Sequence, residues 1–241
     1  MKNSKMKYKR VLLKLSGEGL KGKGTSENSI DNTALYFYAK EIKKLADMGC
    51  EVGVVIGGGN IWRYRNSKDL ELDRVTLDHM GMLATLMNAL ALEAALKKIN
   101  AKAVCLSSFP CEKAMETYTI KKSKDYLSKG NIVVFAGGTG GPFFTTDSSA
   151  ALRAKEMDCD VLFKATKVDG VYDKDPIKFK NAKKFPKMFY KDVIDKKLEV
   201  MDLTCASILS DSKIPMLVFD ITKRDVLKKS VMGENIGTII I

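Results

Sequence analysis

The chain has 241 residues, with 41 Lys and Arg against 29 Asp and Glu, so its formal net charge at pH 7 is +12. Apolar residues make up 45% of the chain and charged residues 29%, a balance that supplies a sizeable core and excludes wholesale disorder. The odd number of cysteines and the single histidine, His79, argue against a disulfide framework and against a structural zinc site.

The sequence predicts a cytoplasmic protein that needs neither a membrane nor a nucleic acid as partner. No stretch approaches the roughly 20 apolar residues of a membrane-spanning helix. The apolar run after the basic start, Val11 to Leu13, is shorter than the roughly 7–15 residues of a secretory signal. The lysines are scattered and not interleaved with aromatic residues, which favours a solvated surface over a nucleic-acid groove.

Apolar runs of strand length alternate with helical patterns along the whole chain. In chain order, the sequence predicts a strand over Arg10–Ser16, a glycine-rich loop, a helix over Asn32–Met48, a strand over Glu51–Ile56, a helix over Asp73–Ile99, and strands over Ala103–Ser107 and Ile132–Ala136. It then predicts a helix over Asp147–Met157, a strand over Asp160–Ala165, a helix over Met201–Asp211, and strands over Pro215–Ile221 and Ile236–Ile241. This alternation is typical of an α/β fold with a mostly parallel sheet covered by helices on both faces.

No repeat, linker or break in composition interrupts the pattern, so residues 1–241 are predicted to form one domain. Asp31 is the predicted N-cap of the first helix, and Gly49 lies just beyond its end. The segment Asp173–Lys191, rich in Lys, Pro and Phe, is predicted to leave the sheet as an excursion.

Glycine clusters follow three of the predicted strands. Leu15 runs into Ser16 and Gly17, Ile56 into Gly57, and Ala136 into Gly137. In open parallel sheets, ligands bind beyond the carboxyl ends of the strands. The three clusters are therefore expected to meet at one ligand site.

Two familiar motifs in the first cluster are rejected on their context. Residues 17–22 match G-x-G-x-x-G, but that motif needs a helix that begins within the glycines. The chain continues through Lys23–Asn28, which does not predict a helix. The same region resembles a P-loop until Gly24 stands where a Ser or Thr would hold Mg²⁺.

The remaining features point to a polyphosphate site. Lys14 places a cation in the first strand, and Gly57–Asn60 offers consecutive backbone N–H groups with no side chains to block a phosphate. Arg63 follows within reach and can bind phosphate oxygens in a bidentate manner. The loop Gly137–Asp147 combines bare backbone, hydroxyl groups and an apolar wall, and ends on a carboxylate.

These blocks resemble the bacterial uridylate (UMP) kinases of the amino acid kinase family over nearly the whole chain. The matching blocks are KLSGE at 14–18, GGGNIWR at 57–63, DHMGMLATLMNALAL at 78–92, GGTGGPFFTTDSSAALRA at 137–154, KATKVDGVYDKDP at 164–176, VMDLT at 200–204 and GENIGTIII at 233–241. PFFTTD together with ATKVDGVY separates this branch from relatives that act on glutamate, aspartate or carbamate. The resemblance implies a three-layer αβα sandwich, the amino acid kinase fold.

The resemblance also implies roles for individual residues. The implied ATP-binding residues are Lys14, Leu15, Ser16, Gly17, Gly59, Arg63, Thr166, Tyr172 and Asp175. The implied UMP-binding residues are Gly58, Asp78, Thr139, Gly140, Gly141, Pro142, Phe143, Phe144, Thr145 and Thr146. The implied catalytic residues are Lys14, Arg63, Asp147 and Asp202, of which the two carboxylates could orient Lys14 or bind metal.

By resemblance we expect transfer of the γ-phosphoryl group of MgATP to UMP in pyrimidine nucleotide synthesis, by an allosteric homohexamer. Mg²⁺ would enter with ATP, and no separate metal site is predicted. UTP is the expected feedback inhibitor. The family's stretch for GTP activation typically reads like Gly-Phe-Gly-Ile, whereas Lys21–Ile30 lacks the aromatic residue, so the usual GTP activation is not expected.

Two alternatives stay open. The first is a sibling kinase of the same fold that acts on another small acid. The second is a non-catalytic nucleotide-binding or RNA-binding regulator that uses the basic surface. PFFTTD argues against the sibling kinase. Phosphoryl transfer needs mostly in-line placement and cations around the moving charge; the chain supplies those residues, which favours a UMP kinase over the non-catalytic regulator.

Overall fold

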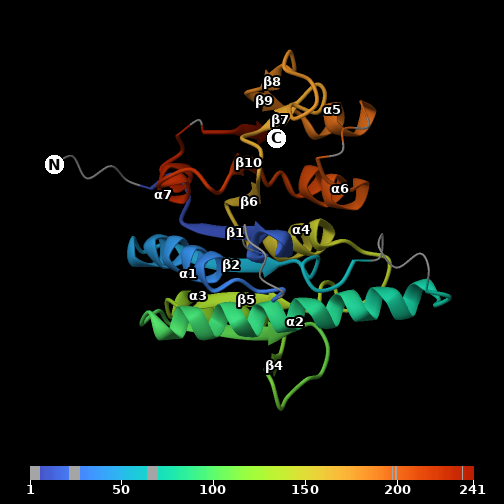
Figure 1. Cartoon of the computed structure of the whole chain (residues 1–241). Helices are drawn as coiled ribbons and strands as arrows, with labels where there is room; N and C mark the ends of the chain where they lie inside the picture. Colours follow the sequence, from blue (N-terminus) through green and yellow to red (C-terminus); the bar gives the residue numbers. More distant parts are fainter. Residues whose placement is uncertain (1–5, 22–27, 64–69, 197, 199, 235) are drawn as a thin grey trace.

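A nine-stranded sheet runs through the middle of the molecule in the order β4-β3-β5-β2-β1-β6-β10-β11-β9 (Figure 1). The strands of this sheet are β1 (Arg10–Leu15), β2 (Glu51–Ile56), β3 (Ala103–Ser107), β4 (Glu116–Thr117), β5 (Ile132–Ala136), β6 (Val161–Thr166), β9 (Lys187–Met188), β10 (Met216–Asp220) and β11 (Thr238–Ile240). Neighbours from β4 through β10 pair in parallel, and β11 pairs antiparallel with β10. The prediction of a mostly parallel sheet is confirmed.

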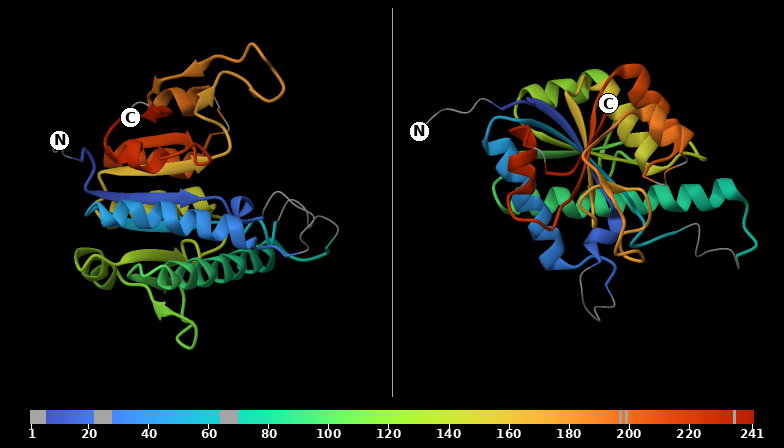
Figure 2. Two further views of the ribbon diagram at one scale, coloured as in Figure 1. Left: turned by 60° about the vertical axis from the view of Figure 1, so that its left-hand side comes forward. Right: turned by 90° about the horizontal axis from the view of Figure 1, so that it is seen from above.

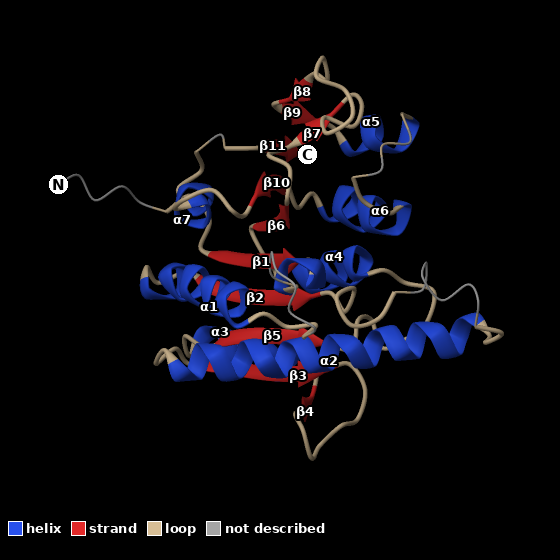
Figure 3. Ribbon diagram, in the orientation of Figure 1, coloured by secondary structure: helices blue, strands red, loops and turns tan. Residues whose placement is uncertain are grey.

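The computed structural model describes residues 6–21, 28–63, 70–196, 198, 200–234 and 236–241. Its helices form two layers, one on each face of the sheet (Figures 2 and 3). One layer consists of α1 (Asn32–Asp47), α2 (Arg74–Lys98) and α7 (Val226–Val231). The other consists of α3 (Ile120–Ser128), α4 (Thr146–Glu156), α5 (Tyr190–Asp195) and α6 (Leu203–Ser212). The predicted three-layer αβα sandwich is therefore confirmed.

Each face of the sheet has its own hydrophobic core, because side chains alternate along a strand. In β1, Val11, Leu13 and Leu15 pack with α1, α2 and α7. Leu12 points the other way and packs with α3, α4 and α6. Lys14 has the same parity as Leu12, so it lies on the α4 face of the sheet.

The helix starts follow from local hydrogen bonding. Asp31 accepts a hydrogen bond from the Ala34 N–H at 2.8 Å and begins α1, as predicted. Asp73 accepts one from the Thr76 N–H at 3.0 Å and begins α2. Such caps satisfy backbone donors that have no partner inside the helix. Gly49 beyond α1 has a φ of +86°, a conformation that favours glycine.

Helix α2 is the one helix in the described part of the chain that is long and apolar enough to cross a membrane. No stretch of the sequence was expected to approach the length and apolar character of a membrane-spanning helix, and α2 meets both criteria. Half of its apolar stretch, however, is buried inside the molecule. Leu92 and Leu96 are fully buried against the sheet. A core helix of this kind passes the same test of length and composition.

Several short elements differ from the sequence-based expectation. The first glycine cluster begins with a 3-10 helix, η1 (Gly17–Leu20), rather than an open loop. Strand β7 (Val171–Tyr172), just before the predicted excursion, and β8 (Lys184–Phe185), within it, form a separate antiparallel pair. Strand β9, however, rejoins the main sheet beside β11 and leads into α5. Helices α3 and α7 were not predicted, because each is short and rich in lysine.

Candidate active site

The carboxyl ends of four adjacent strands define the site. The order β5-β2-β1-β6 puts the glycine clusters after β5, β2 and β1 side by side. A Cβ on Gly17 would lie 2.5 Å from Asn60 Oδ1, and a Cβ on Gly57 would lie 3.4 Å from Thr146 Oγ1. The first cluster therefore packs on the second, and the second on the start of α4, as the sequence predicted.

Two lysines lie side by side on the α4 face of the sheet. Lys14 of β1 and Lys164 of β6 are register partners in the parallel pair, where neighbouring strands are about 4.8 Å apart. Lys14 Nζ lies 2.8 Å from Asp147 Oδ1, and Lys164 Nζ forms an ion pair with Asp147 Oδ2. A single carboxylate at the start of α4 thus holds two ammonium groups together.

The electrostatics of this cluster follow from burial and charge. Burial by itself would raise the pKa of Asp147, but the charges of Lys14 and Lys164 outweigh it and hold the pKa at about 2. Burial lowers the pKa of Lys164 below its usual value of 10.5, with Asp147 opposing the shift. Asp147 therefore stays ionised at neutral pH and keeps both ammonium groups in place.

The triglycine turn after β2 is held by a buried pair of amides. Asn88, fully buried in α2, donates to Gly57 O at 2.7 Å and to Asn60 Oδ1 at 2.7 Å. Asn60 donates back to Asn88 Oδ1 at 3.0 Å. In a trans peptide the N–H points opposite to the C=O, so anchoring Gly57 O toward Asn88 turns the Gly58 N–H to the other side.

Helix α2 also explains why residue 58 is glycine. A Cβ there would lie 2.8 Å from Ala84 Cβ and 2.9 Å from Gly81 O, closer than side chains pack. Beyond the turn, Arg63 donates from Nε to Gly59 O at 2.9 Å and forms an ion pair with Glu18 of η1. The predicted cation therefore lies at the turn, bridging the first two glycine clusters.

The third glycine loop has an unusual backbone and is tied to α2. Phe143 has a φ of +71°, and its N–H donates to Asp78 Oδ2 at 2.8 Å. Arg74 Nε donates to both Asp78 oxygens at 2.8 and 2.9 Å. Phe143 and Phe144 are 63% and 54% exposed, so the predicted apolar wall faces open space. Asp78 and this loop thus meet as expected for one binding surface.

The end of the loop is tied to α6 by Asp202. Thr145 caps α4, accepting from the Asp147 and Ser148 N–H groups, and donates to Asp202 Oδ2. Asp202 Oδ1 accepts from Ser148 Oγ at 2.7 Å and from the Cys205 N–H at 2.9 Å. Asp202 is the N-cap of α6, so its observed contacts are those of an anchor for the start of α4.

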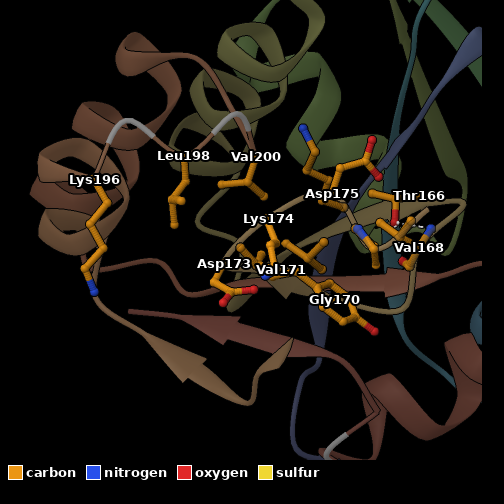
Figure 4. A pocket seen from close by; sticks show the side chains of 14 residues that line it. Thr166, Val168, Gly170, Val171, Asp173, Lys174, Asp175, Lys196, Leu198 and Val200 are labelled. Atoms are coloured by element: carbon orange, nitrogen blue, oxygen red, sulfur yellow. Dashed lines mark hydrogen bonds between the residues drawn. The ribbon is translucent and has the colours of Figure 1, made fainter. Parts of the chain in front are cut away.

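A cavity of about 620 Å³ opens beside β6 (Figure 4). Strand β6 lies on the other side of β1 from β2 and β5, the strands that lead into the second and third glycine loops. Its lining includes Lys164 together with three predicted ATP-binding residues, Thr166, Tyr172 and Asp175. Val171, Val200 and Val218 add an apolar surface. Charged side chains, among them Asp173, Lys174 and Lys196, complete the lining. A pocket that combines apolar surface with convergent polar groups is a candidate small-ligand site, and Lys164 connects this one to the lysine pair.

The chain is similar to known proteins over nearly its whole length. The model of the amino acid kinase family matches residues 9–220. The chain belongs to the amino acid kinase family. A uridylate kinase of Legionella pneumophila (strain Paris) is 49% identical over 236 residues, covering 98% of this chain and 95% of that protein. A uridylate kinase of Chromohalobacter salexigens is 48% identical over 239 residues, covering 99% and 94%.

Solved structures of the same family are similar throughout. The UMP kinase of Bacillus anthracis superimposes with a TM-score of 0.93 at 38% identity, covering 97% of this chain and 96% of that one. The UMP kinase of Ureaplasma parvum has a TM-score of 0.91 at 36% identity, covering 98% and 99%. The resemblance seen in the motifs is confirmed, and so is the amino acid kinase fold.

Two residues at the candidate site, Lys164 and Asn88, were not predicted from the sequence. Lys164 stands in an otherwise apolar strand, VLFKAT, and a lone lysine in such a strand was the available signal. Asn88 is the one polar side chain of the stretch LATLMNALAL that lies fully buried. Its role became visible only once α2 was packed on the triglycine turn.

Some of the predicted binding residues make local hydrogen bonds, and one predicted segment lies mostly outside the described residues. Leu15 has a buried side chain, and its carbonyl accepts from the Gly57 N–H at 3.0 Å. Thr139 Oγ1 bonds within its own loop, to Gly141. Most of the stretch expected to govern the GTP response, residues 22–27, lies outside the described residues.

Proposed function

We propose that the chain transfers the γ-phosphoryl group of MgATP to UMP, giving UDP and ADP. The observation that carries the proposal is the Lys14–Asp147–Lys164 cluster. Lys164 lines the cavity beside β6, whereas Lys14 and Asp147 adjoin the first and third glycine loops. Similarity to uridylate kinases over nearly the whole chain narrows the acceptor to UMP. On this proposal residues 1–241 form a single amino acid kinase domain.

ATP binds with its adenosine in the cavity beside β6. Thr166, Tyr172 and Asp175 hold the base and sugar, and the triphosphate runs toward Lys14 over Ser16, Gly17 and Gly59. The Tyr172 hydroxyl donates to Asp169 at 2.6 Å, which orients the ring at the cavity wall. The phosphates thus arrive where the two lysines concentrate positive charge.

UMP binds on the opposite side of β1. Asp78 contacts the ribose hydroxyls, and Gly58 with Arg63 holds the phosphate. The loop from Thr139 to Thr146 surrounds the uracil, whose edge its backbone groups can read. Because β2 lies next to β1, the acceptor phosphate then faces the γ-phosphate of ATP.

The chemistry is an in-line displacement. A phosphate oxygen of UMP attacks the γ-phosphorus, the bond to the bridging oxygen breaks, and ADP leaves with that electron pair. Lys14 and Lys164 stabilise the charge that spreads over the transferred oxygens. Asp147 orients the two ammonium groups and takes no proton, since its pKa of about 2 keeps it ionised.

The donor set fits Mg²⁺ bound chiefly by the phosphates of ATP. No group of three or more His, Cys, Asp or Glu among the described residues is arranged to hold a metal. Asp147 Oδ1 is a buried oxygen that pairs with Lys14 Nζ at 2.8 Å, and no further hydrogen bond reaches it from the part of the chain described. Mg²⁺ is usually bound by one or two carboxylates together with phosphate oxygens of the substrate, and it would neutralise part of the negative charge of the phosphates.

The remaining properties belong to the same proposal. The enzyme works as an allosteric homohexamer in the cytoplasm, in pyrimidine nucleotide synthesis. UTP inhibits it as the end product. GTP activates it weakly if at all, because the stretch Lys21–Ile30 lacks the aromatic residue typical of the response. Titration of each nucleotide at subsaturating ATP tests both effects, and strong activation by GTP would refute the second.

A coupled assay for ADP production tests the central claim. ATP is offered with UMP, CMP, dTMP, glutamate and aspartate in parallel. Turnover with UMP well above the other acceptors is the expected result. Turnover with another acceptor would identify a sibling kinase of the fold, and no turnover combined with tight RNA binding would identify a regulator.

A further inference from the structure

A buried arginine lies behind the third glycine loop. Arg153 of α4 is 3% exposed, and its guanidinium carbon sits 3.9 Å from the ring centre of Tyr118. Nη1 donates to Glu156 at 2.5 Å. Nη2 donates to Ser108 Oγ at 3.0 Å and lies 3.5 Å from Gly138 O. The guanidinium therefore reaches from the helix back to the loop that precedes it.

Ser108 links Arg153 to the glycine loop through its hydroxyl group. Its hydroxyl lies 2.8 Å from Gly138 O and 3.0 Å from Ala136 O, and its backbone N–H donates to Ala136 O at 3.0 Å. A Cβ on Gly140 would lie 3.0 Å from Ser108 O. Arg153 and Ser108 thus hold the rear of the loop from two directions.

The loop needs such support because its backbone is left-handed at three glycines. The φ angles are +76° at Gly137, +60° at Gly138 and +90° at Gly140. Glycine reaches these angles freely, but it also loses more conformational freedom than any other residue when it is ordered. Unless hydrogen bonds fix it, a loop of this composition samples many arrangements.

Fixing Gly138 O determines where the next amide points. In a trans peptide the Thr139 N–H lies opposite to the Gly138 C=O. With the carbonyl turned toward Arg153 and Ser108, that N–H faces the other side of the loop. The same peptide unit therefore offers a donor to whatever ligand the loop surrounds.

The arginine is costly as a purely structural residue. Its Nε is buried and has no hydrogen-bond partner in the described part of the chain, and leaving a buried donor unpaired destabilises a fold. An apolar side chain of similar volume often packs there at no loss of stability. An apolar residue would lose the ion pair with Glu156 and the cation–π contact with Tyr118 as well, but of the contacts made by Arg153 only those to Ser108 and Gly138 reach the glycine loop.

We propose that Arg153 is a positioning residue for the acceptor nucleotide: acting through Ser108, it sets the conformation of the glycine loop that reads the base. The inference rests on the proposed function, since it assigns UMP to this loop. It predicts that weakening the clamp impairs UMP use while ATP use is preserved, because the cavity for ATP lies across β1 from the loop.

The test compares KM for UMP and for ATP in wild type, Arg153→Lys, Arg153→Met and Ser108→Ala. Each substitution should raise KM for UMP by about 10-fold, the change expected from one charge-assisted hydrogen bond, with KM for ATP within about twofold. Calorimetric titration of UMP should show the same weakening in Kd. The double variant Arg153→Lys with Ser108→Ala should raise KM for UMP little more than either substitution alone, because both residues act on the same contact with the loop.

Lys155→Met is the matched control, since Lys155 also carries a charge on α4 but pairs with Asp211 at the surface. It should leave both KM values unchanged. Parallel changes in KM for both nucleotides, or an unchanged KM for UMP in Ser108→Ala, would overturn the proposal. Should Arg153→Met fail to fold, Arg153→Lys and Ser108→Ala decide the outcome. Wild type that does not use UMP at all would instead refute the proposed function.

Discussion

Lys14 and Lys164 are forced together by the register of two parallel strands. Like charges on neighbouring strands repel each other, and the arrangement holds because Asp147 contacts both ammonium groups. Single residues thus set the charge at the point where the phosphoryl group would move.

Lys164→Met should lower kcat by roughly 10²-fold or more, because it removes a cation that stabilises the transition state. Stability should be unchanged or higher, since burial lowers the pKa of Lys164 and so disfavours its charged form. Steady-state kinetics and urea unfolding measure the two effects. Lys129→Met, at the exposed end of α3, is the control and should alter neither. A Lys164→Met variant with near-normal kcat would remove the residue from the mechanism.

Asp147→Asn should alter how stability depends on pH. The folded state lowers the pKa of Asp147 from 3.8 to about 2, so its stabilising effect is complete above pH 4 and disappears as pH falls toward 2. The difference in unfolding free energy between wild type and Asp147→Asn should therefore shrink between pH 4 and pH 2. Urea unfolding at pH 6, 4 and 3 measures it. A difference that stays constant over this range would contradict the assignment.

At the scale of elements, the start of α4 is fixed by hydrogen bonds to α6. Asp202 accepts from Thr145, Ser148 and the Cys205 N–H, so one carboxylate caps α6 and anchors the cap of α4. Asp147 is the second residue of α4. The position of Asp147, the carboxylate proposed to orient the two lysines, therefore depends on how α4 and α6 are joined.

Asp202→Ala should cost about 1–2 kcal/mol of stability through the lost cap and should also lower kcat, because the start of α4 loses its anchor. Thr119→Ala is a matched control: Thr119 caps α3, accepting from the Lys122 N–H at 3.2 Å. It should reduce stability in a similar way with activity intact. Urea unfolding and kinetics on both variants give the comparison. Equal kcat values would confine Asp202 to a structural role.

At the scale of the molecule, α2 carries apolar side chains on both sides. Leu92 and Leu96 are buried on the sheet, whereas Leu83 and Met87, one turn apart, are 53% and 55% exposed. Exposed apolar residues grouped on one helix face are typical of a protein interface. This face supports the proposed homohexamer.

The double variant Leu83→Glu with Met87→Glu should therefore reduce the assembly to smaller species, because charges placed in an apolar contact are costly to bury. Light scattering coupled to size-exclusion chromatography measures the mass. Lys121→Glu, exposed on α3, is the control and should leave the mass unchanged. An unaltered hexamer in the double variant would show that α2 does not contribute to the interface.

Local pattern determined most of the α/β framework. Strands at 51–56, 103–107 and 132–136 were predicted to the residue, because each is a short apolar run bounded by polar or glycine positions. Helix α3 escaped prediction because only Ser123 and Leu127 are buried in it, which leaves too weak an apolar stripe. Strand β9 was not predicted because it has only two residues, and these form a strand only by pairing with β11.

Residue types along the chain also specify the components of the candidate site: glycines after three strands, Lys14 in the first strand, and Asp147 at a helix start. Residue types and their spacing express such features directly, since backbone freedom and charge are properties of the residues themselves. Which of these groups come into contact depends on how the strands and helices pack. Strand register brought Lys164 beside Lys14, and the packing of α2 and α4 placed Asn88 and Arg153 behind the glycine loops, contacts between residues far apart along the chain that no local pattern encodes.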